Sequence, residues 1–478
     1  MMNPTEHILK HFEAVSSIPR GTKDEAGIRR WLIEWATASR FGSRTDAMGN
    51  LVIQVPASAG RESEPVLILQ GHMDMVWQKT PESTHDFTRD PIRLIRDGDW
   101  IHAADTTLGA DNGIAIALMM ALVEDDAVSH PPLELLLTVE EELGLEGAHK
   151  LDPALLTGNT LINLDSEKEG VFTVGCAGGG TVYVTLPVTW NPQTADESAF
   201  VVNVGGLRGG HSGEDINKNR ANANKVMARV LDAIQRATPI RLAALKGGTA
   251  RNAIPRDTEA AFVCNAGQSA LCRQAFEEIA ADIRAELALT EPGLFIKMTG
   301  QEKSLGRAIR PEESRDALRL ITALPHGVAS MSTDVPNFVE TSNNIGIVEL
   351  KEDGLEVVSN HRSAILSKLE EISRRVESLA WLAGAQTRRT ALSHPWQANM
   401  ESALLKKCQR VYKQVIGTAP TVELSHAGLE CGILSDRCGG LDTISFGPTI
   451  ENPHSPDERL HVPSLAGTWK FLKAILES

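Results

Sequence analysis

The chain is poor in cysteine, in long apolar runs and in basic residues, and each shortage excludes a class of protein. Its six cysteines are scattered through 478 residues and form no CxxC pair, so we expect reduced thiols. No stretch reaches the roughly 18 consecutive apolar residues that a membrane-spanning helix needs. The net charge of −15 argues against nucleic acid as a partner, because binding phosphates requires a basic face.

The remaining composition is that of a globular protein. Hydrophobic residues make up 42% and charged residues 23% of the chain, which is not the composition of a disordered one. A length of 478 residues exceeds one ordinary core, so we expect two or three domains. The segment from His7 to Ile18 has the apolar spacing of an amphipathic helix, and residues 1–40 contain no short apolar core with a cleavage site. We therefore expect a cytoplasmic location.

The order of apolar segments predicts an α/β fold. Residues 1–186 alternate helical patterns with short apolar strands, which is typical of a mixed, largely parallel sheet flanked by helices. Residues 185–199 are rich in Pro, Thr and Asn and are interpreted as a hinge, so a second α/β domain is expected over 187–390. Residues 391–478 form the last part. In the first part the expected elements are strands 51–55, 66–69, 133–139 and 161–164 and an apolar helix over 113–124.

Four short motifs follow strands or precede a helix in the α/β parts. His72 and Asp74 come directly after the apolar run 66–69, where an imidazole suits zinc and a nearby carboxylate can hold its other nitrogen. Asp111 lies in the glycine-flanked loop 109–113 before the apolar helix; its alternative role is a helix N-cap. Asp165 ends the strand 161–164, with a cap or turn residue as the alternative.

The acid triplet Glu140-Glu141-Glu142 follows strand 133–139 and repels itself unless a cation is bound. A divalent metal would offset the repulsion, with one acid as ligand and its neighbour free to accept a proton; the alternative is a solvated loop. His454, between two prolines in 453–456, is the last candidate, with a surface loop histidine as its alternative.

Together these side chains match the ligands of a two-metal site. Ligands bind at the carboxyl ends of strands in such sheets, so the loops are expected to meet at one edge. Two histidines with three acids suit a pair of metals about 3.5–4 Å apart that share a bridging carboxylate.

The motif set resembles the co-catalytic dizinc peptidases of the aminoacylase/carboxypeptidase-G2 clan over nearly the whole chain. The matching segments are 71–74, 109–113, 141–144, Asp165 and His454. Within the clan the chain looks most like the aminoacyl-histidine dipeptidases (peptidase D, Xaa-His dipeptidases), because of segments 103–109, 426–432 and 453–458. Asp165 in place of a glutamate favours peptidases over the clan's deacylases.

The resemblance implies a role for each residue. Asp111 bridges both metals, His72 and Asp165 complete one, and Glu142 and His454 complete the other. Asp74 orients His72, and Glu141 is the general base. Gly144 sets the alignment of the triplet, although a slip by one residue stays open because the chain has Glu140 where the clan often has aspartate.

The resemblance also implies that residues 187–390 are an inserted lid and dimerisation domain between two parts of the catalytic domain, 1–186 and 391–478. Three lid residues match the clan's substrate contacts: His211, Asn252 and Arg362. An arginine suits a peptide carboxylate by bidentate pairing, and a surface salt bridge is the alternative for Arg362.

The implied activity is hydrolysis of a dipeptide, most of all Xaa-His such as carnosine, by a homodimer with two Zn²⁺ per subunit. Cobalt and manganese tolerate the same ligands. Two alternatives stay open: a broad di- or tripeptidase or N-acyl amino acid deacylase of the same clan, and a metal-binding protein without catalysis.

Overall fold

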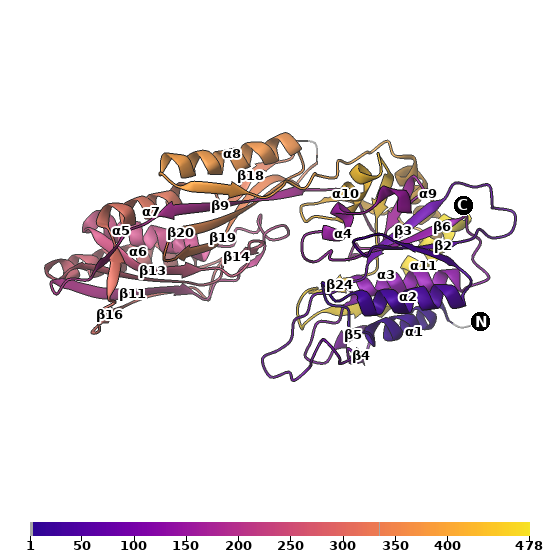
Figure 1. Ribbon diagram of the computed structural model, residues 1–478, viewed down its shortest axis with the longest axis horizontal. Helices are drawn as coiled ribbons and strands as arrows, with labels where there is room; N and C mark the ends of the chain where they lie inside the picture. Colours follow the sequence, from indigo (N-terminus) through magenta and orange to yellow (C-terminus); the bar gives the residue numbers. More distant parts are fainter. Residues whose placement is uncertain (1–2, 334) are drawn as a thin grey trace. The chain divides into compact units, whose positions relative to one another are not determined.

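The computed structural model describes residues 3–333 and 335–478, which form two compact units (Figure 1). The first unit contains the chain up to Cys176, Trp396–Leu424 and Leu429–Ser478. The second contains Ala177–Pro395 and Ser425–Gly428, so it is inserted into the first. The sequence predicts the boundaries at 186/187 and 390/391. The structure has them at 176/177 and 395/396, because residues 178–187 already form a strand of the second unit's sheet.

The first unit is built on a mixed sheet whose centre is parallel. Strands β6, β3, β7 and β23 pair in parallel, whereas β1, β2 and β8 pair antiparallel with their neighbours. This confirms the predicted α/β class and all four strands expected there. In spatial order the strands are β1 (Gly42–Thr45), β2 (Leu51–Val55), β6 (Leu133–Thr138), β3 (Leu67–His72), β7 (Thr160–Asn163), β23 (Asp442–Ser445), β8 (Val171–Cys176) and β22 (Thr421–Ser425).

Helices cover both faces of this sheet because successive strand side chains point to opposite sides. Leu51 and Ile53 belong to the larger core cluster, whereas Val52 between them belongs to a separate cluster on the other face. The larger cluster packs beneath α1 (Pro4–Ser16), α2 (Ala26–Ala38), α3 (Ala110–Val123), α9 (Ala403–Ile416) and α11 (Val462–Glu477). The opposite cluster packs beneath α4 (Glu146–His149) and α10 (Glu430–Arg437).

Helix α3 is the most buried element of the first unit. Every residue from Asn112 to Leu122 is buried, as expected for a helix that is apolar all round. It packs against β3 and α1, so its N-terminus, which carries Asp111, lies close to the end of β3. A small antiparallel sheet of the first unit is formed by β4 (Leu94–Asp97), β5 (Trp100–Ala103), β24 (Ile450–Glu451) and β25 (Arg459–His461).

The second unit is a long antiparallel sheet with helices packed against it (Figure 1). Its strands, in spatial order, are β16 (Phe295–Gln301), β11 (Glu197–Gly205), β15 (Thr258–Asn265), β13 (Ile240–Gly247), β19 (Val339–Leu350), β20 (Gly354–Ser363), β9 (Gly178–Pro187) and β21 (Gln386–Arg389), with β18 (Gly327–Met331) on β19. The helices are α5 (Ala223–Ala237), α6 (Ser269–Leu287), α7 (Pro311–Ala323) and α8 (Leu366–Leu382). Short pairs join β10 (Trp190–Pro192) to β17 (Arg307–Ile309) and β12 (Gly210–His211) to β14 (Ala253–Ile254).

The segment interpreted as a hinge, 185–199, lies inside the second unit. It contains the end of β9, all of β10 and the start of β11, so its turn-forming residues mark connections between strands and not a domain boundary. Helix α5 begins at Ala223, where the Asn222 side chain accepts hydrogen bonds from the backbone N–H groups of residues 224 and 225.

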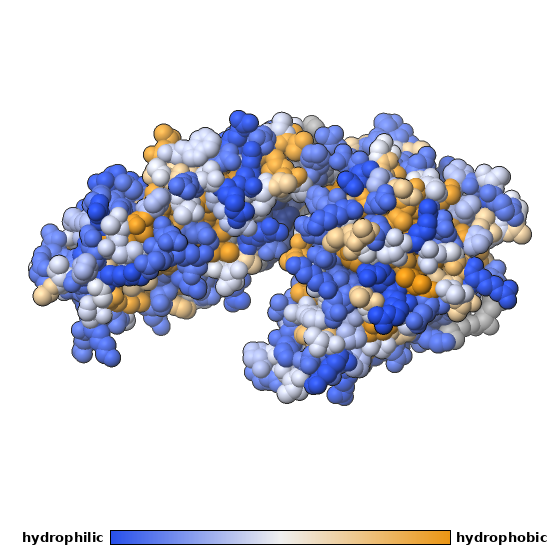
Figure 2. Space-filling model, in the orientation of Figure 1, coloured by the Kyte–Doolittle hydropathy of each residue, from blue (hydrophilic) through white to orange (hydrophobic). Residues whose placement is uncertain are grey.

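All six cysteines are free thiols, and five of them are buried. Within residues 3–333 and 335–478, no helix is long and apolar enough to cross a membrane. The face drawn in Figure 2 is mostly hydrophilic, with apolar side chains in small groups.

Candidate metal centre

His72 is the last residue of β3 and is almost completely buried, with 1% of its surface exposed. Its backbone N–H donates to Asn112 Oδ1 at 3.2 Å, which fastens the strand end to the first turn of α3. Glycine at position 71 permits this approach, because a Cβ there would meet Asn112 Oδ1 at 2.4 Å and Ala115 Cβ at 2.9 Å. The sequence therefore fixes the distance between the β3 end and α3 by omitting one side chain.

Asp74 is fully buried and contacts both His72 and the acid triplet. His72 Nδ1 lies 3.1 Å from the backbone carbonyl oxygen of Asp74 and 3.3 Å from its Oδ1, so this nitrogen faces Asp74 and Nε2 faces the other way. Asp74 also accepts hydrogen bonds from the backbone N–H groups of Glu141 and Glu142, at 3.1 and 3.2 Å, and from Thr22 Oγ1 at 2.9 Å. One carboxylate thus orients the histidine and holds the loop that carries the two acids.

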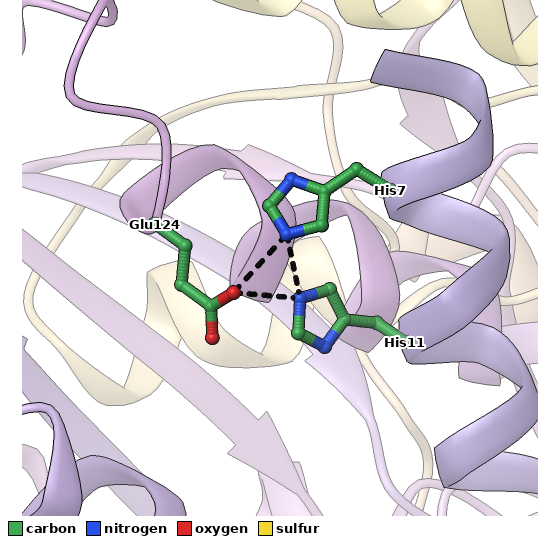
Figure 3. A group of neighbouring side chains, drawn as sticks. All are labelled: His7, His11 and Glu124. Carbon is green, nitrogen blue, oxygen red and sulfur yellow. Dashed lines mark hydrogen bonds and ion pairs between the residues drawn. The ribbon is translucent and has the colours of Figure 1, made fainter. Parts of the chain in front are cut away.

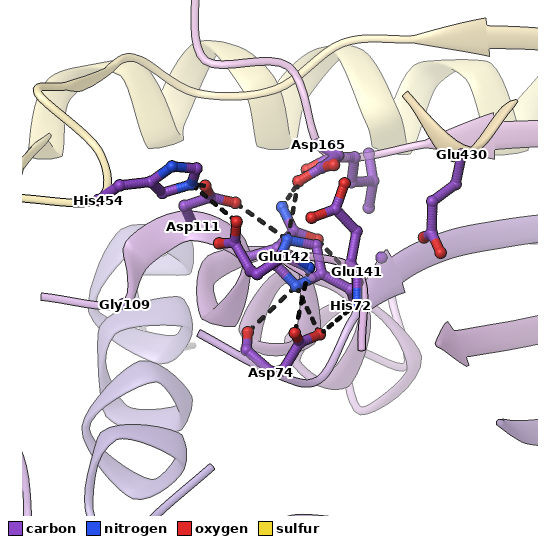
Figure 4. Close-up of polar contacts among 12 residues, drawn as sticks. His72, Asp74, Gly109, Asp111, Glu141, Glu142, Asp165, Glu430 and His454 are labelled. Carbon is purple, nitrogen blue, oxygen red and sulfur yellow. Dashed lines mark hydrogen bonds and ion pairs between the residues drawn. The ribbon is translucent and has the colours of Figure 1, made fainter. Parts of the chain in front are cut away.

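Asp111 lies between the two histidines, with one carboxylate oxygen toward each. Oδ1 is 3.0 Å from His72 Nε2, and Oδ2 is 2.9 Å from His454 Nε2 (Figure 4). This is the placement that a carboxylate bridging two metals requires.

The remaining acids complete a group around each histidine. Asp165 Oδ1 lies 3.4 Å from His72 Nε2, and Glu142 Oε2 lies 3.0 Å from His454 Nε2. The ligand atoms of His72, Asp111 and Asp165 lie within 4.8 Å of one another, as do those of Asp111, Glu142 and His454. Glu141 joins His72 and Glu142 in a third such group, whereas Glu140 belongs to none that the described residues form.

Two buried oxygens in this cluster make no hydrogen bond within the described chain: Oε1 of Glu142, and Oδ1 of Asp165, which has the 3.4 Å ion-pair contact with His72 Nε2. A buried carboxylate oxygen without a partner costs free energy unless a cation binds it. The donor set of imidazole nitrogens and carboxylate oxygens is the one that zinc and related divalent metals take. The residues present therefore fit a pair of metal ions that share Asp111.

Burial and mutual repulsion shift the pKa values of the carboxyl groups in this cluster, as expected where acids are crowded together at a cation site. It raises the pKa of Glu141 well above its ordinary value, with further increases from the charges of Glu142 and Asp165. Burial also raises the pKa of Asp165 to about 6. For Asp111 burial acts in the same direction, but hydrogen bonds from His454 and His72 outweigh it and lower the pKa. Asp111 is consequently ionised, which suits a bridge.

Arg20 and Glu458 position the metal-centre loops, and the sequence patterns do not reveal either of them. Arg20 is buried and donates to the carbonyl oxygens of Met73 and Asp74, both at 3.0 Å, and to that of Gly109. Glu458 accepts from the backbone N–H groups of Leu108, Gly109 and Asp111 at 2.8, 2.9 and 3.2 Å. Each joins segments that are far apart in the chain, so no local spacing marks them.

Glu430, at the start of α10, is a further buried acid near the cluster (Figure 4). Burial raises its pKa to about 8. Its Oε2 accepts hydrogen bonds from the side chains of Gln70 and Thr138, both at 2.6 Å, and these hold the carboxyl group in place. It belongs to segment 426–432, one of those that carry the family resemblance.

In the second unit the three expected lid residues also lie close together. His211 lies at the end of β12, and its Nε2 is 3.4 Å from Arg362 Nη2. Asn252 precedes β14, and its carbonyl oxygen accepts from Ser212 N at 2.7 Å. His426 is hydrogen-bonded to Ser342 Oγ at 2.7 Å, and its pKa is lowered to about 3 by burial and by the charges of Arg362 and His211.

Comparison with known proteins identifies the group to which this architecture belongs. The family model for peptidase family M20/M25/M40 matches residues 68–478, a span that contains every acid and histidine of the metal centre. The cytosol non-specific dipeptidase of Escherichia coli (strain K12) is 36% identical over 98% of this chain and 96% of its own.

Comparison with solved structures gives the same result. The crystal structure of aminoacylhistidine dipeptidase from Vibrio alginolyticus is 35% identical, covers 98% of this chain and 96% of its own, and superposes with a TM-score of 0.82. Aminopeptidase PepT from Bacillus cereus, 17% identical over 99% of this chain and 98% of its own, has a TM-score of 0.56 and shares the fold. The resemblance drawn from the motifs is confirmed: the chain belongs to peptidase family M20/M25/M40 and is a metallopeptidase.

Proposed function

We propose that this metallopeptidase cleaves dipeptides, with a preference for a C-terminal histidine as in carnosine. The observation that carries the proposal is the position of Asp111, with one oxygen at 3.0 Å from His72 and the other at 2.9 Å from His454. The relatives named as dipeptidases support the reaction class. The histidine preference is supported by the relative from Vibrio, whose name specifies aminoacyl-histidine, and opposed by the Escherichia relative, named non-specific.

Two divalent cations, zinc in the first instance and cobalt or manganese as alternatives, would be held by five residues. They are His72, Asp111, Glu142, Asp165 and His454. When bound, such a pair lowers the pKa of a water molecule and polarises a peptide carbonyl. Asp74 holds His72 by its Nδ1, so that Nε2 is presented as the ligand atom.

Glu141 would act as the general base. Its side chain lies in one group with His72 and Glu142, and burial raises its pKa well above the ordinary value, which suits a group that accepts and returns a proton. The backbone N–H of Glu141 is fixed by Asp74, which keeps the carboxylate aimed into the cluster. The same carboxyl would pass its proton to the leaving amine.

The second unit would supply the substrate contacts. Arg362 is suited to the terminal carboxylate of a dipeptide, and His211 beside it could donate to the oxygen that gains charge in the transition state. Asn252 is the third proposed contact. We also propose that the protein is a homodimer, with the second unit as its dimerisation domain, and that it resides in the cytoplasm like the relative whose name says cytosol.

A matched pair of variants tests the assignment of the base. Glu141→Gln should keep its metal content but lose at least about 100-fold in kcat, because general-base catalysis contributes roughly 10²–10⁴-fold. Glu140→Gln removes the same charge one residue earlier, and its side chain belongs to no ligand group among the described residues, so it should remain active. An active Glu141→Gln enzyme would refute the role of Glu141.

Substrate choice is tested separately, with the wild-type enzyme loaded with Zn²⁺ or Mn²⁺. The panel compares carnosine, other Xaa-His dipeptides, Leu-Gly, a tripeptide and an N-acetyl amino acid by kcat/KM. A preference for Xaa-His of tenfold or more supports the proposal, and equal rates on Leu-Gly favour a broad dipeptidase. Hydrolysis of the N-acetyl amino acid alone would make the protein a deacylase. A metal-loaded protein inactive on the whole panel would favour a metal-binding role.

A further inference from the structure

A second cluster of metal-type side chains lies on the first unit, away from the centre described above. His7 and His11 are one turn apart on α1, and Glu124 follows directly after α3 as its C-cap residue (Figure 3). Asp111 is at the other end of α3, about 20 Å away at a rise of about 1.5 Å per residue. The ligand atoms of the three residues lie within 4.8 Å of one another.

The three ligand atoms form a small, nearly equilateral triangle. Nε2 of His7 and Nε2 of His11 lie 3.1 and 2.9 Å from the same oxygen of Glu124, Oε2, and 3.2 Å from each other. A tetrahedral zinc with bonds of about 2.0–2.1 Å has ligand atoms about 3.3 Å apart. The triangle therefore has nearly the dimensions of one face of a zinc tetrahedron, with the fourth position left for water.

The spacing in the sequence explains why both imidazoles point the same way. Residues at i and i+4 lie on one face of a helix, so both rings project from α1 toward α3. Their side chains are 20% and 12% exposed, which leaves the ring nitrogens accessible to an ion. An ordinary pair of His–Glu hydrogen bonds would not require the two ring nitrogens to face each other at 3.2 Å, because two N–H groups in that position repel.

Glu124 is held in place by a neighbour that is not a ligand. Trp35 Nε1, on α2, donates to Oε1 of Glu124 at 2.8 Å and leaves Oε2 for the histidines. Ligating carboxylates are commonly oriented by such a hydrogen bond from outside the ligand set. The cluster therefore has both the ligands and the support that a built metal site needs.

The position at the end of α3 adds an electrostatic reason. The C-terminus of a helix carries a partial negative charge, and the last turn of α3 contains no basic residue to offset it. Glu124 adds a full negative charge at this point. A divalent ion bound to Glu124 would be stabilised by both the carboxylate and the helix end.

We propose that His7, His11 and Glu124 bind a Zn²⁺ ion that fastens α1 to the C-terminal end of α3. The ion is separate from the metal centre at Asp111 and takes no part in catalysis. It cross-links segments 113 residues apart and stabilises the first unit.

The test compares zinc binding to the full chain and to a variant with one ligand changed. Tag-free protein is stripped of metal, equilibrated with ZnCl₂ at a buffered micromolar concentration, and analysed for zinc per chain. Glu124→Gln should bind one equivalent fewer than the wild type, while an amide oxygen remains to accept from Trp35. Asp126→Asn, which removes the same charge two residues later from an exposed side chain, should bind as much zinc as the wild type.

Stability provides the second measurement. Zinc added to the wild type should raise Tm by about 3 °C more than it does in Glu124→Gln, as expected for an ion present at about ten times its Kd. In EDTA the two proteins should melt together, which shows that the variant is folded. His7→Gln should reproduce the loss of one equivalent. Equal zinc content in wild type, Glu124→Gln and His7→Gln would overturn the proposal.

Discussion

Replacing Asp74 by asparagine tests whether one buried carboxylate controls both the histidine ligand and the acid loop. Asp74 accepts from three donors, the N–H groups of Glu141 and Glu142 and the hydroxyl of Thr22, and also faces His72 Nδ1 at 3.3 Å. An asparagine keeps one oxygen and replaces the other by an NH₂ group. In either orientation of the amide, at least one backbone N–H then faces another donor.

The size of the effect follows from these contacts. A hydrogen bond to an ionised group contributes about 1.5–3 kcal/mol, and the change removes two such contacts at whichever oxygen is lost. Release of the buried charge offsets part of this loss, so we expect the free energy of unfolding to fall by about 3 kcal/mol. A carboxylate behind a metal-binding histidine contributes about 10–100-fold to metal affinity, so zinc should bind Asp74→Asn weaker by that factor.

The assay is competition for zinc with a chromophoric chelator, followed by kcat measurement at saturating metal. Thr22→Val is the matched control, because it removes one neutral donor and leaves the carboxylate in place; its zinc affinity should change less than threefold. If Asp74→Asn binds zinc as tightly as the wild type and turns over at the same rate, the carboxylate does not orient His72 or the loop, and the reasoning fails.

Two other predictions concern packing and pH. Gly71→Ala should lower the free energy of unfolding by about 1–3 kcal/mol and reduce metal content, because the new Cβ would meet Asn112 Oδ1 at 2.4 Å. The control is Gly42→Ala, whose new Cβ would meet only a glutamine side chain at 3.2 Å. Urea unfolding should show this control to be nearly as stable as the wild type. The second unit should lose stability in acid. Burial lowers the pKa of His361 to about 3 and, with the charge of Lys225, that of His326 to about 4.

The sign of the pH effect follows from these directions. Both histidines are neutral when folded, while the unfolded chain takes up protons below its ordinary histidine pKa of about 6.5, so stability falls as the pH drops from about 6.5 toward 4. At pH 5 each of the two histidines lowers the free energy of unfolding by about 2 kcal/mol. Tm measured from pH 7.5 to 5 should therefore fall, and less steeply in His361→Gln. A Tm gap between the two proteins that does not change with pH would contradict the assignment, and an unchanged Tm in Gly71→Ala would contradict the packing argument.

Much of the fold could be predicted because its signals are local. The apolar runs at 51–55, 133–139 and 161–164 and the all-apolar segment 113–124 became β2, β6, β7 and α3 with shifts of a few residues at most. Element order along the chain then implied an α/β sheet and a second domain, and the family resemblance implied that this domain is inserted. The domain boundary was misplaced by about ten residues, because a run of Pro, Thr and Asn looks alike in a hinge and in the connections between antiparallel strands.

The residues of the candidate site also fall into two groups, those that the local sequence identifies and those that only contacts between distant segments identify. Residue type and local position were enough to select these candidates, because His72 and the acid triplet follow a strand and Asp111 precedes a helix. Whether a side chain supports others depends on contacts across the chain. Arg20 reaches Gly109, and Glu458 reaches Leu108 from 350 positions away, so nothing near either residue marks its role.

By itself, the sequence determined the chemical groups of this peptidase, their order, and the family to which they belong. Only the tertiary structure decided that Asp74 holds the acid loop as well as the histidine, and that Glu124 lies against His7 and His11 at the far end of α3. The reason is physical: residue type and periodicity are set over a few positions, whereas hydrogen bonds and ligand geometry depend on which distant segments the buried core brings together.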